Sequence, residues 1–149
     1  MRLILLTLAM SLYFLPLSAT EVDSPEQYVE ARLKIMKYIG TQMRTLGNIQ
    51  RGRSDFNPEY VGSAMGAIAT MSETFKLLFP ENSFIPPSDA LEDIVGNEEF
   101  ISILNQLRDA ATQVSVNPTE EVFSEAFSQM GGACSSCHRQ FRDHSSHSH

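Results

Sequence analysis

Apolar residues recur every three or four positions over most of the chain beyond residue 24, which is the spacing of one face of an α-helix. The pattern forms four separate stripes. The first stripe consists of Val29, Leu33, Met36, Ile39, Met43, Leu46 and Ile49. The other three lie within residues 58–79, 100–114 and 118–141. No segment shows a convincing strand pattern, so the chain is predicted to be helical throughout.

Capping residues and prolines predict where these helices begin and end. Ser24-Pro25 and Asn57-Pro58 each place an N-cap residue before a proline at the first helical position, and Asn117-Pro118 predicts the same start for the last helix. Pro80 is expected to stop the second helix, and the proline-containing stretch 79–97 forms a long connection. Four amphipathic helices joined in this way predict an all-α fold, an antiparallel four-helix bundle.

The start of the chain has the features of an export signal. Arg2 is followed by an apolar run and then by small residues up to Ala19. This layout is typical of a signal peptide at 1–19, and the run is short for a membrane span. An uncleaved N-terminal anchor is the alternative. Export predicts a periplasmic protein, with the bundle domain at 20–143 and a disordered polar tail at 144–149.

The charge of the chain restricts its partners. The formal charge is −7 at pH 7, and removal of Arg2 makes it more negative. Nucleic acids and anionic membranes are themselves negative, so an acidic chain is unsuited to bind them. No second apolar run is long enough to cross a bilayer. We therefore expect no nucleic-acid partner, and a mature protein that is soluble in the exported compartment.

The only two cysteines, Cys134 and Cys137, are separated by two residues, and His138 follows directly. Such a pair can serve thiol exchange, metal binding or covalent haem attachment. A zinc site needs four ligands, and the other histidines all lie in the tail, at 144, 147 and 149. A thioredoxin-like dithiol belongs at the start of a helix after a strand, whereas these cysteines lie late in a predicted helix. The spacing on a regular helix also disfavours a disulfide.

Covalent haem attachment fits this motif best, because C-x-x-C-H is its recognised spacing. Residues i and i+3 of a helix share one face, so each sulfur can form a thioether with one vinyl group of a porphyrin. His138 would then reach the iron as the proximal ligand. Gly131 and Gly132 precede the motif and predict that the macrocycle lies against the helix where a Cβ would collide. A kink or loose packing is the alternative.

Three segments carry a resemblance to a known family. Residues 32–47 have the pattern R-x-x-I-M-K-x-x-G-x-x-M-x-x-L-G, residues 77–83 read LLFPENS, and residues 132–142 read G-x-C-x-x-C-H-x-x-F-R. Together they resemble the class II c-type cytochromes, the cytochrome c prime group, over essentially the whole mature chain. That group is itself a standard example of the four-helix bundle. The resemblance implies one haem c per chain, attached covalently to the C-terminal helix.

Members of that group differ on the distal side of the haem. Five-coordinate members cover the iron with an apolar residue of the first helix and bind gases such as nitric oxide. Six-coordinate, low-spin members bind the iron through a first-helix methionine. Met36 stands at this position, and its surroundings look more like the six-coordinate branch. The resemblance implies Met36 as a distal ligand. The alternative is core filling, the usual role of a methionine on an apolar stripe.

The resemblance also implies a haem environment formed by Arg32, Gly40, Met43, Gly132, Phe141 and Arg142. Arg32 is similar to the residue that meets a haem propionate, and a solvated surface charge is its alternative. Arg142 lies four residues after His138 on the same helix face. It is expected either to pack near the proximal imidazole or to stabilise the helix dipole. The family's tryptophan near the start of the third helix is absent, and Ile94-Val95 lie near that place.

These features predict a periplasmic monohaem electron carrier rather than an enzyme. A helix-held His/Met pair changes little between the two oxidation states, and a thioether ligand raises the potential. The acidic surface predicts a redox partner protein with a basic docking patch. The resemblance adds a homodimer through the first two helices as a further expectation. A gas-binding protein with an open distal position and a dithiol oxidoreductase without haem are the alternatives.

Overall fold

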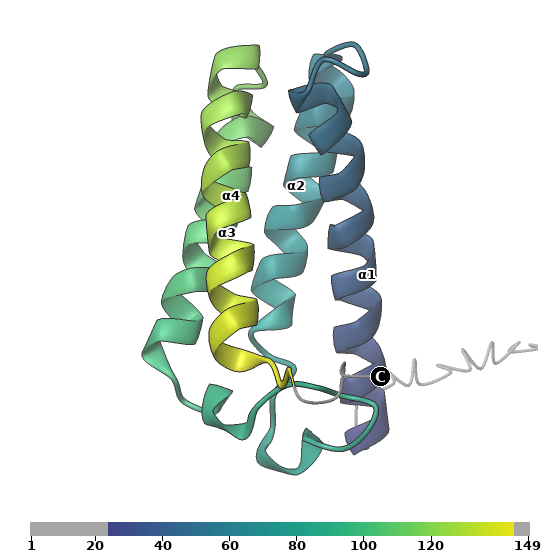
Figure 1. Ribbon diagram of the computed structural model, residues 1–149, viewed down its shortest axis with the longest axis vertical. Coiled ribbons are helices and arrows are strands. Elements are labelled where there is room, and N and C mark those ends of the chain that lie inside the picture. The colour runs from purple at the N-terminus through teal and green to yellow at the C-terminus, as the bar shows by residue number, and fades with distance from the viewer. Residues whose placement is uncertain (1–23, 145–149) are drawn as a thin grey trace, which may run out of the picture.

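Four helices make up most of residues 24–144, the part of the chain that the computed structural model describes (Figure 1). They are α1 (Pro25–Gln50), α2 (Pro58–Phe75), α3 (Glu98–Val116) and α4 (Glu120–Phe141). Two 3-10 turns, η1 (Glu81–Ser83) and η2 (Glu92–Ile94), lie in the connection between α2 and α3. Residues 24–144 contain no strand, only an isolated β-bridge between Ala90 and Arg142.

The helices lie side by side along the long axis of the molecule and alternate in direction (Figure 1). The connections 51–57 and 117–119 are at one end of the bundle. The long connection 76–97 is at the other end, beside the C-terminal end of α4. The predicted all-α class and antiparallel four-helix bundle are therefore confirmed.

Two sequence predictions fall on other parts of the chain. The signal peptide at 1–19 lies outside the described residues, and so do residues 145–149 of the predicted tail. Among residues 24–144, none of the helices combines the length and the apolar character that a membrane span requires.

The N-caps explain why the first two helices begin where the sequence predicts. The side chain of Ser24 accepts a hydrogen bond from the backbone N–H of Gln27, and that of Asn57 accepts one from Tyr60. Each bond satisfies a backbone donor that has no partner inside the helix. A proline follows each cap, where its missing N–H costs nothing.

The predicted start of the last helix is wrong by two residues. Asn117 ends α3, where its backbone N–H donates to the carbonyl of Gln113. Helix α4 begins after Thr119, whose side chain accepts from the N–H of Val122. Asn117 is taken up by the preceding helix as the C-cap of α3, with φ −140° and ψ 75°. The cap of α4 is therefore Thr119, which has the extended geometry typical of an N-cap, with φ −102° and ψ 156°.

The second helix also ends earlier than Pro80, the predicted stop. Helix α2 ends at Phe75, and the chain tightens into i to i+3 bonds from Leu77 to Thr74 and from Leu78 to Phe75. Beyond the end of α2, the carbonyl of Leu78 accepts a hydrogen bond from Arg32 of α1. This bond connects the start of the long connection to α1.

The bundle packs unevenly. Helix α3 contacts α2 and α4 closely, whereas α1 contacts α2 less and touches α4 in few places. A Cβ added at Gly66 of α2 would lie 2.8 Å from the Oγ of Ser115, so the backbones of α2 and α3 approach each other closely there. The side chains with no exposure include Leu46, Val61, Met65, Ile68, Val114 and Met130. Room for a cavity remains between α1 and α4.

The position of the last N-cap can be tested by stability. Thr119→Ala should lower the free energy of unfolding by about 1 kcal/mol, because a backbone donor of the first turn loses its partner. Asn117→Ala should change it by less than about 0.5 kcal/mol. Urea unfolding followed by circular dichroism measures both values. A larger loss for Asn117→Ala than for Thr119→Ala would contradict this assignment.

Candidate haem site

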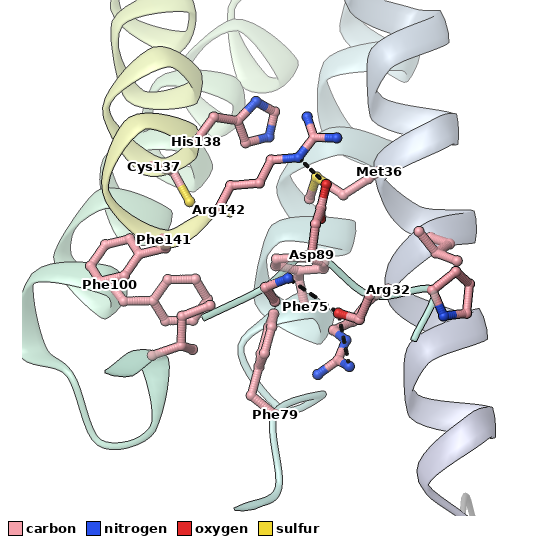
Figure 2. Close-up of a pocket in the computed structure, with 15 residues that line it drawn as sticks. Arg32, Met36, Phe75, Phe79, Asp89, Phe100, Cys137, His138, Phe141 and Arg142 are labelled. Carbon is pink, nitrogen blue, oxygen red and sulfur yellow. Dashed lines mark hydrogen bonds and ion pairs between the residues drawn. The ribbon is translucent and has the colours of Figure 1, made fainter. Parts of the chain in front are cut away.

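A cavity of about 450 Å³ lies between α1 and the C-terminal end of α4, where the long connection closes the bundle (Figure 2). All four helices and the long connection contribute residues to its walls. Helix α1 contributes Arg32, Leu33 and Met36, and the end of α2 with the long connection contributes Phe75, Phe79, Pro87, Ser88, Asp89, Ala90 and Ile94. Helix α3 contributes Phe100, and the end of α4 contributes Cys137, His138, Phe141 and Arg142.

Phenylalanine rings form an apolar wall of this cavity. Phe100 lies edge to face with both Phe79 and Phe141, at centroid distances of 5.1 and 5.5 Å, and Phe75 packs on Phe79 in the same way at 5.0 Å. Edge-to-face pairs at such distances are favourable geometry for aromatic rings. The wall joins α2, α3 and α4 and gives the cavity a fixed, water-excluding side.

The C-x-x-C-H motif occupies the last two turns of α4. Cys137 and His138 line the cavity, while Cys134 is half-buried against the core one turn earlier. Both cysteines are free thiols. Among residues 24–144 no cluster of three or more histidine, cysteine or acidic side chains could hold a metal ion. The described residues therefore offer no closed zinc site.

Both thiols are held in the neutral form. Burial raises the pKa of Cys134, and burial followed by the neighbouring Cys134 raises the pKa of Cys137 to about 11. Thiol exchange requires a thiolate, and catalytic dithiols have lowered pKa values. This electrostatic environment opposes the dithiol oxidoreductase alternative. Of the two neutral thiols, that of Cys137 lies on the cavity wall, where a thioether to a bound ring could form.

The imidazole of His138 is also kept neutral. Burial is the largest cause that lowers its pKa, the charge of Arg142 lowers it further, and Asp89 acts in the opposite direction. A metal binds the neutral imidazole, so the lowered pKa favours a ligand role. Met36 reaches the same cavity from α1, on the wall across from α4 (Figure 2). A thioether and an imidazole from two different helices therefore line one cavity.

Arg32 is buried rather than exposed, which contradicts the surface-charge alternative. Only 4% of its surface is accessible. Its guanidinium donates to the carbonyl of Leu78 at 3.1 Å, to the Oγ of Ser83 at 2.9 Å, to the carbonyl of Ser83, and to the Oγ of Ser88 at 3.4 Å. It also lies over the ring of Phe79 at 4.8 Å. Arg32 thus fastens the long connection to α1, a role that the sequence did not reveal.

No carboxylate among residues 24–144 pairs with this buried cation, and its Nε has no hydrogen-bond partner there. Burial lowers the pKa of Arg32, although a guanidinium stays positive in proteins. A buried charge normally has an opposite charge beside it. Because Arg32 lines the cavity, an anionic group held there would supply the missing partner. This property fits a haem with its propionates.

Arg142 lies at the end of α4 beside His138. Its side chain forms an ion pair with Asp89 of the long connection, across the cavity (Figure 2). Of the two roles predicted for Arg142, its proximity to the imidazole agrees with packing near His138. Asp89 could not be predicted from local sequence, because its partner is fifty-three positions away in the chain and no motif marks it.

Three residues predicted for the haem environment lie elsewhere. Gly40 and Met43 are not part of the cavity wall, and Gly132 lines a separate hollow between α3 and α4. A Cβ added at Gly40, Gly131 or Gly132 would meet no neighbouring atom within 4 Å. The protein's own packing therefore does not require glycine at these positions. Contact of the glycines with a macrocycle stays a prediction.

Phe141 and Ile94 add apolar side chains to the cavity wall. Phe141 of α4 is buried among the phenylalanine rings, and Ile94 of η2 is buried and lines the same cavity. A haem contact of Phe141 stays a prediction.

The four-helix bundle and the C-x-x-C-H motif beside an apolar cavity define a c-type cytochrome of the bundle class. A protein-family model described as Cytochrome C′ matches residues 27–142. The chain therefore belongs to the cytochrome c′ family. Its cofactor is covalently bound haem c, one per chain, and it is a monohaem protein of the electron-carrier type.

Individual relatives agree with this assignment. The chain is 30% identical to cytochrome c′ of Pararhodospirillum photometricum over 125 residues, which cover 80% of this chain and 99% of the relative. It is 29% identical to cytochrome c-556 of Agrobacterium fabrum over 116 residues, covering 76% and 80%. The solved structure of cytochrome c′ from Rhodopseudomonas palustris matches with a TM-score of 0.71 and 26% identity, covering 79% and 97%. These relatives are cytochromes rather than typical enzymes.

The raised thiol pKa values can be tested in the haem-free protein. With Cys134→Ser leaving one thiol, burial alone still raises the pKa of Cys137, so it should react with iodoacetamide at pH 7 on the order of ten-fold more slowly than an exposed cysteine. The rate should keep rising at pH values where the exposed control has levelled off. Ser54→Cys in the cysteine-free chain is the exposed control. Equal rates at pH 7 would contradict the burial of this thiol.

Proposed function

We propose that this protein transfers single electrons in the periplasm through a haem held by Cys134, Cys137, His138 and Met36. The observation that carries the proposal is that Met36 of α1 and His138 of α4 line one cavity from two helices. Bound haem supplies a one-electron couple between ferric and ferrous iron. Thioether formation at Cys134 and Cys137 would fix the ring to α4.

The chain's own residues have distinct tasks in this proposal. His138 presents a neutral imidazole that would bind the iron, and Met36 presents a thioether, a ligand type that would raise the potential. Because each ligand is held by a long helix, little rearrangement accompanies electron transfer. Phe75, Phe79 and Phe141 exclude water from the cavity.

Arg32 has the charge that haem propionates require. It is buried, it lines the cavity, and no carboxylate of residues 24–144 pairs with it. We propose that it pairs with a propionate while its remaining hydrogen bonds hold the long connection. A charge-assisted bond of this kind is stronger than a neutral one, and it would resolve the cost of the buried cation.

Partner choice and location follow from the acidic chain and its export-like start. A formal charge of −7 favours a redox partner with a basic docking patch and an association rate that falls with salt. The signal-like residues 1–19 support a periplasmic location. The homodimer through α1 and α2 stays a prediction.

Gas binding at an open distal position is the second candidate function. The relative from Pararhodospirillum photometricum is named cytochrome c′, the group in which the five-coordinate branch occurs, whereas the Agrobacterium relative is a cytochrome c-556. The two functions differ in one bond, that between Met36 and iron. Absorption spectra decide between them: a low-spin ferric spectrum with a weak far-red sulfur-to-iron band supports Met36 ligation, and a high-spin spectrum without it supports gas binding.

Met36→Ala should convert the haem from low-spin to high-spin and allow it to bind carbon monoxide, because the sixth position opens. Absorption spectra of the ferric, ferrous and carbonmonoxy protein measure this change. Met43→Ala is the matched control: Met43 lies on the same stripe of α1 but not on the cavity wall, so its spectrum should stay low-spin. A high-spin wild-type spectrum, or no change in Met36→Ala, would contradict ligation by Met36.

Covalent attachment can be tested separately from ligation. In the wild-type protein, acid–acetone should leave the haem with the polypeptide, because two thioether bonds hold it. In the Cys134→Ala/Cys137→Ala variant the extractable fraction should rise to essentially all of the haem bound. Mass spectrometry of the denatured chain gives an independent reading. Loss of the wild-type haem on extraction would contradict attachment through these cysteines.

A further inference from the structure

The segment 87–91, here called the strap, is joined to the end of α4 by its backbone. The N–H of Leu91 donates to the carbonyl of Phe141 at 3.0 Å, and the N–H of Asp143 donates to the carbonyl of Asp89 at 2.7 Å. These bonds surround the isolated antiparallel bridge between Ala90 and Arg142. The backbone of Asp89 is therefore fixed against α4 independently of its side chain.

The side chain of Asp89 adds a charged contact to this backbone pairing. Its carboxylate accepts a hydrogen bond from the Nε of Arg142 in an ion pair, with 29% of the Asp89 side chain and 38% of the Arg142 side chain exposed. Partial burial screens such a pair less than full exposure would. Both residues line the cavity together with His138 (Figure 2).

An arginine at the end of a helix has a long side chain that can extend into solvent, where its charge would have little effect on the cavity. Here the strap holds the acidic partner at the cavity wall, and the guanidinium lies beside it. Arg142 and Asp89 line the same cavity as His138, so the charges of both face the place where His138 would bind a ligand. The position of the Arg142 charge should therefore affect the properties of a group bound to His138.

We propose that Asp89 is a positioning residue that holds the guanidinium of Arg142 beside His138 and thereby lets Arg142 influence the potential of the haem. The inference rests on the proposed function, in which His138 is the proximal ligand. Asp89 itself touches neither iron nor ligand atoms in this account. Its effect passes through Arg142, and the strap supplies the rigid backbone from which it acts.

The physical expectation follows from charge. Ferric haem carries one more positive charge than ferrous haem, so a nearby cation favours the ferrous state and raises the potential. Arg142→Gln should lower the potential of the wild-type protein. In the Asp89→Asn background the guanidinium is no longer held by this ion pair, and the same Arg142→Gln change should shift the potential by less than half as much. Such non-additivity is the mark of two residues that act as a unit.

The experiment is a double-mutant cycle on the holoprotein: wild type, Asp89→Asn, Arg142→Gln and the double variant, each titrated by spectroelectrochemistry. Asparagine keeps the size of Asp89 and an acceptor oxygen, and the backbone bonds of the strap remain available. Asp89→Glu retains a carboxylate and should restore at least part of the wild-type response to Arg142→Gln. A purely structural role of Asp89 would not be restored by charge alone.

Asp109→Asn provides the matched control. Asp109 also pairs with an arginine, Arg108, but lies outside the wall of the haem cavity. Removing its charge should leave both the potential and the response to Arg142→Gln close to the wild-type values. Urea unfolding of each variant identifies any loss of fold, and the absorption spectrum reports whether the spin state is kept.

The outcomes separate the inference from the proposed function. Equal shifts for Arg142→Gln in the wild-type and Asp89→Asn backgrounds mean that the two charges act independently, which overturns the positioning role alone. The absence of any shift for Arg142→Gln overturns it as well. Wild-type protein without covalently attached haem overturns the proposed function, and the inference falls with it. A response to Arg142→Gln that depends on Asp89 and returns with Asp89→Glu supports it.

Discussion

One buried cation, Arg32, organises the end of the bundle at which the long connection 76–97 lies. Arg32 of α1 bonds to Leu78, Ser83 and Ser88, three residues of the chain between α2 and α3, and it has no carboxylate partner among residues 24–144. Because α1 touches α4 in few places, these bonds are the main polar link between α1 and the rest of this end. Arg32 lines the cavity between α1 and α4 and ties the long connection to α1 beside it.

The chemistry of the site follows from this separation of α1 and α4. Helix α4 carries the thiols and the imidazole, α1 carries the thioether and the cation, and the phenylalanine wall between them keeps the cavity apolar. An apolar cavity disfavours thiolate and imidazolium alike, which matches the raised pKa of Cys137 and the lowered pKa of His138. The same environment that makes a poor thiol exchanger suits a covalently held, low-charge macrocycle.

Local sequence predicted the helices well because their causes are local. The apolar stripes and the caps at Ser24 and Asn57 lie within a few residues of the features they predict. The errors occurred where a neighbouring element decides the outcome. Asn117 serves as the C-cap of α3, so the cap of α4 is Thr119, and the bond from Arg32 to Leu78 accompanies the early end of α2. The hydrogen bonds of the buried Arg32 join residues that are 46 to 56 positions apart in the chain. Asp89 and Arg142 are 53 positions apart. No sequence motif indicates such distant pairs.

The sequence alone determined the class of the protein, its cofactor and three residues of the motif that would hold it, because C-x-x-C-H needs only one helix to bring two sulfurs and an imidazole to one face. The tertiary structure decided which other residues reach that face. It brought Met36, Arg32 and Asp89 to the cavity of His138 and left Gly40, Met43 and Gly132 outside its wall. The physical reason is that helix spacing assigns a residue to a face, whereas only the packing of the four helices determines what that face meets.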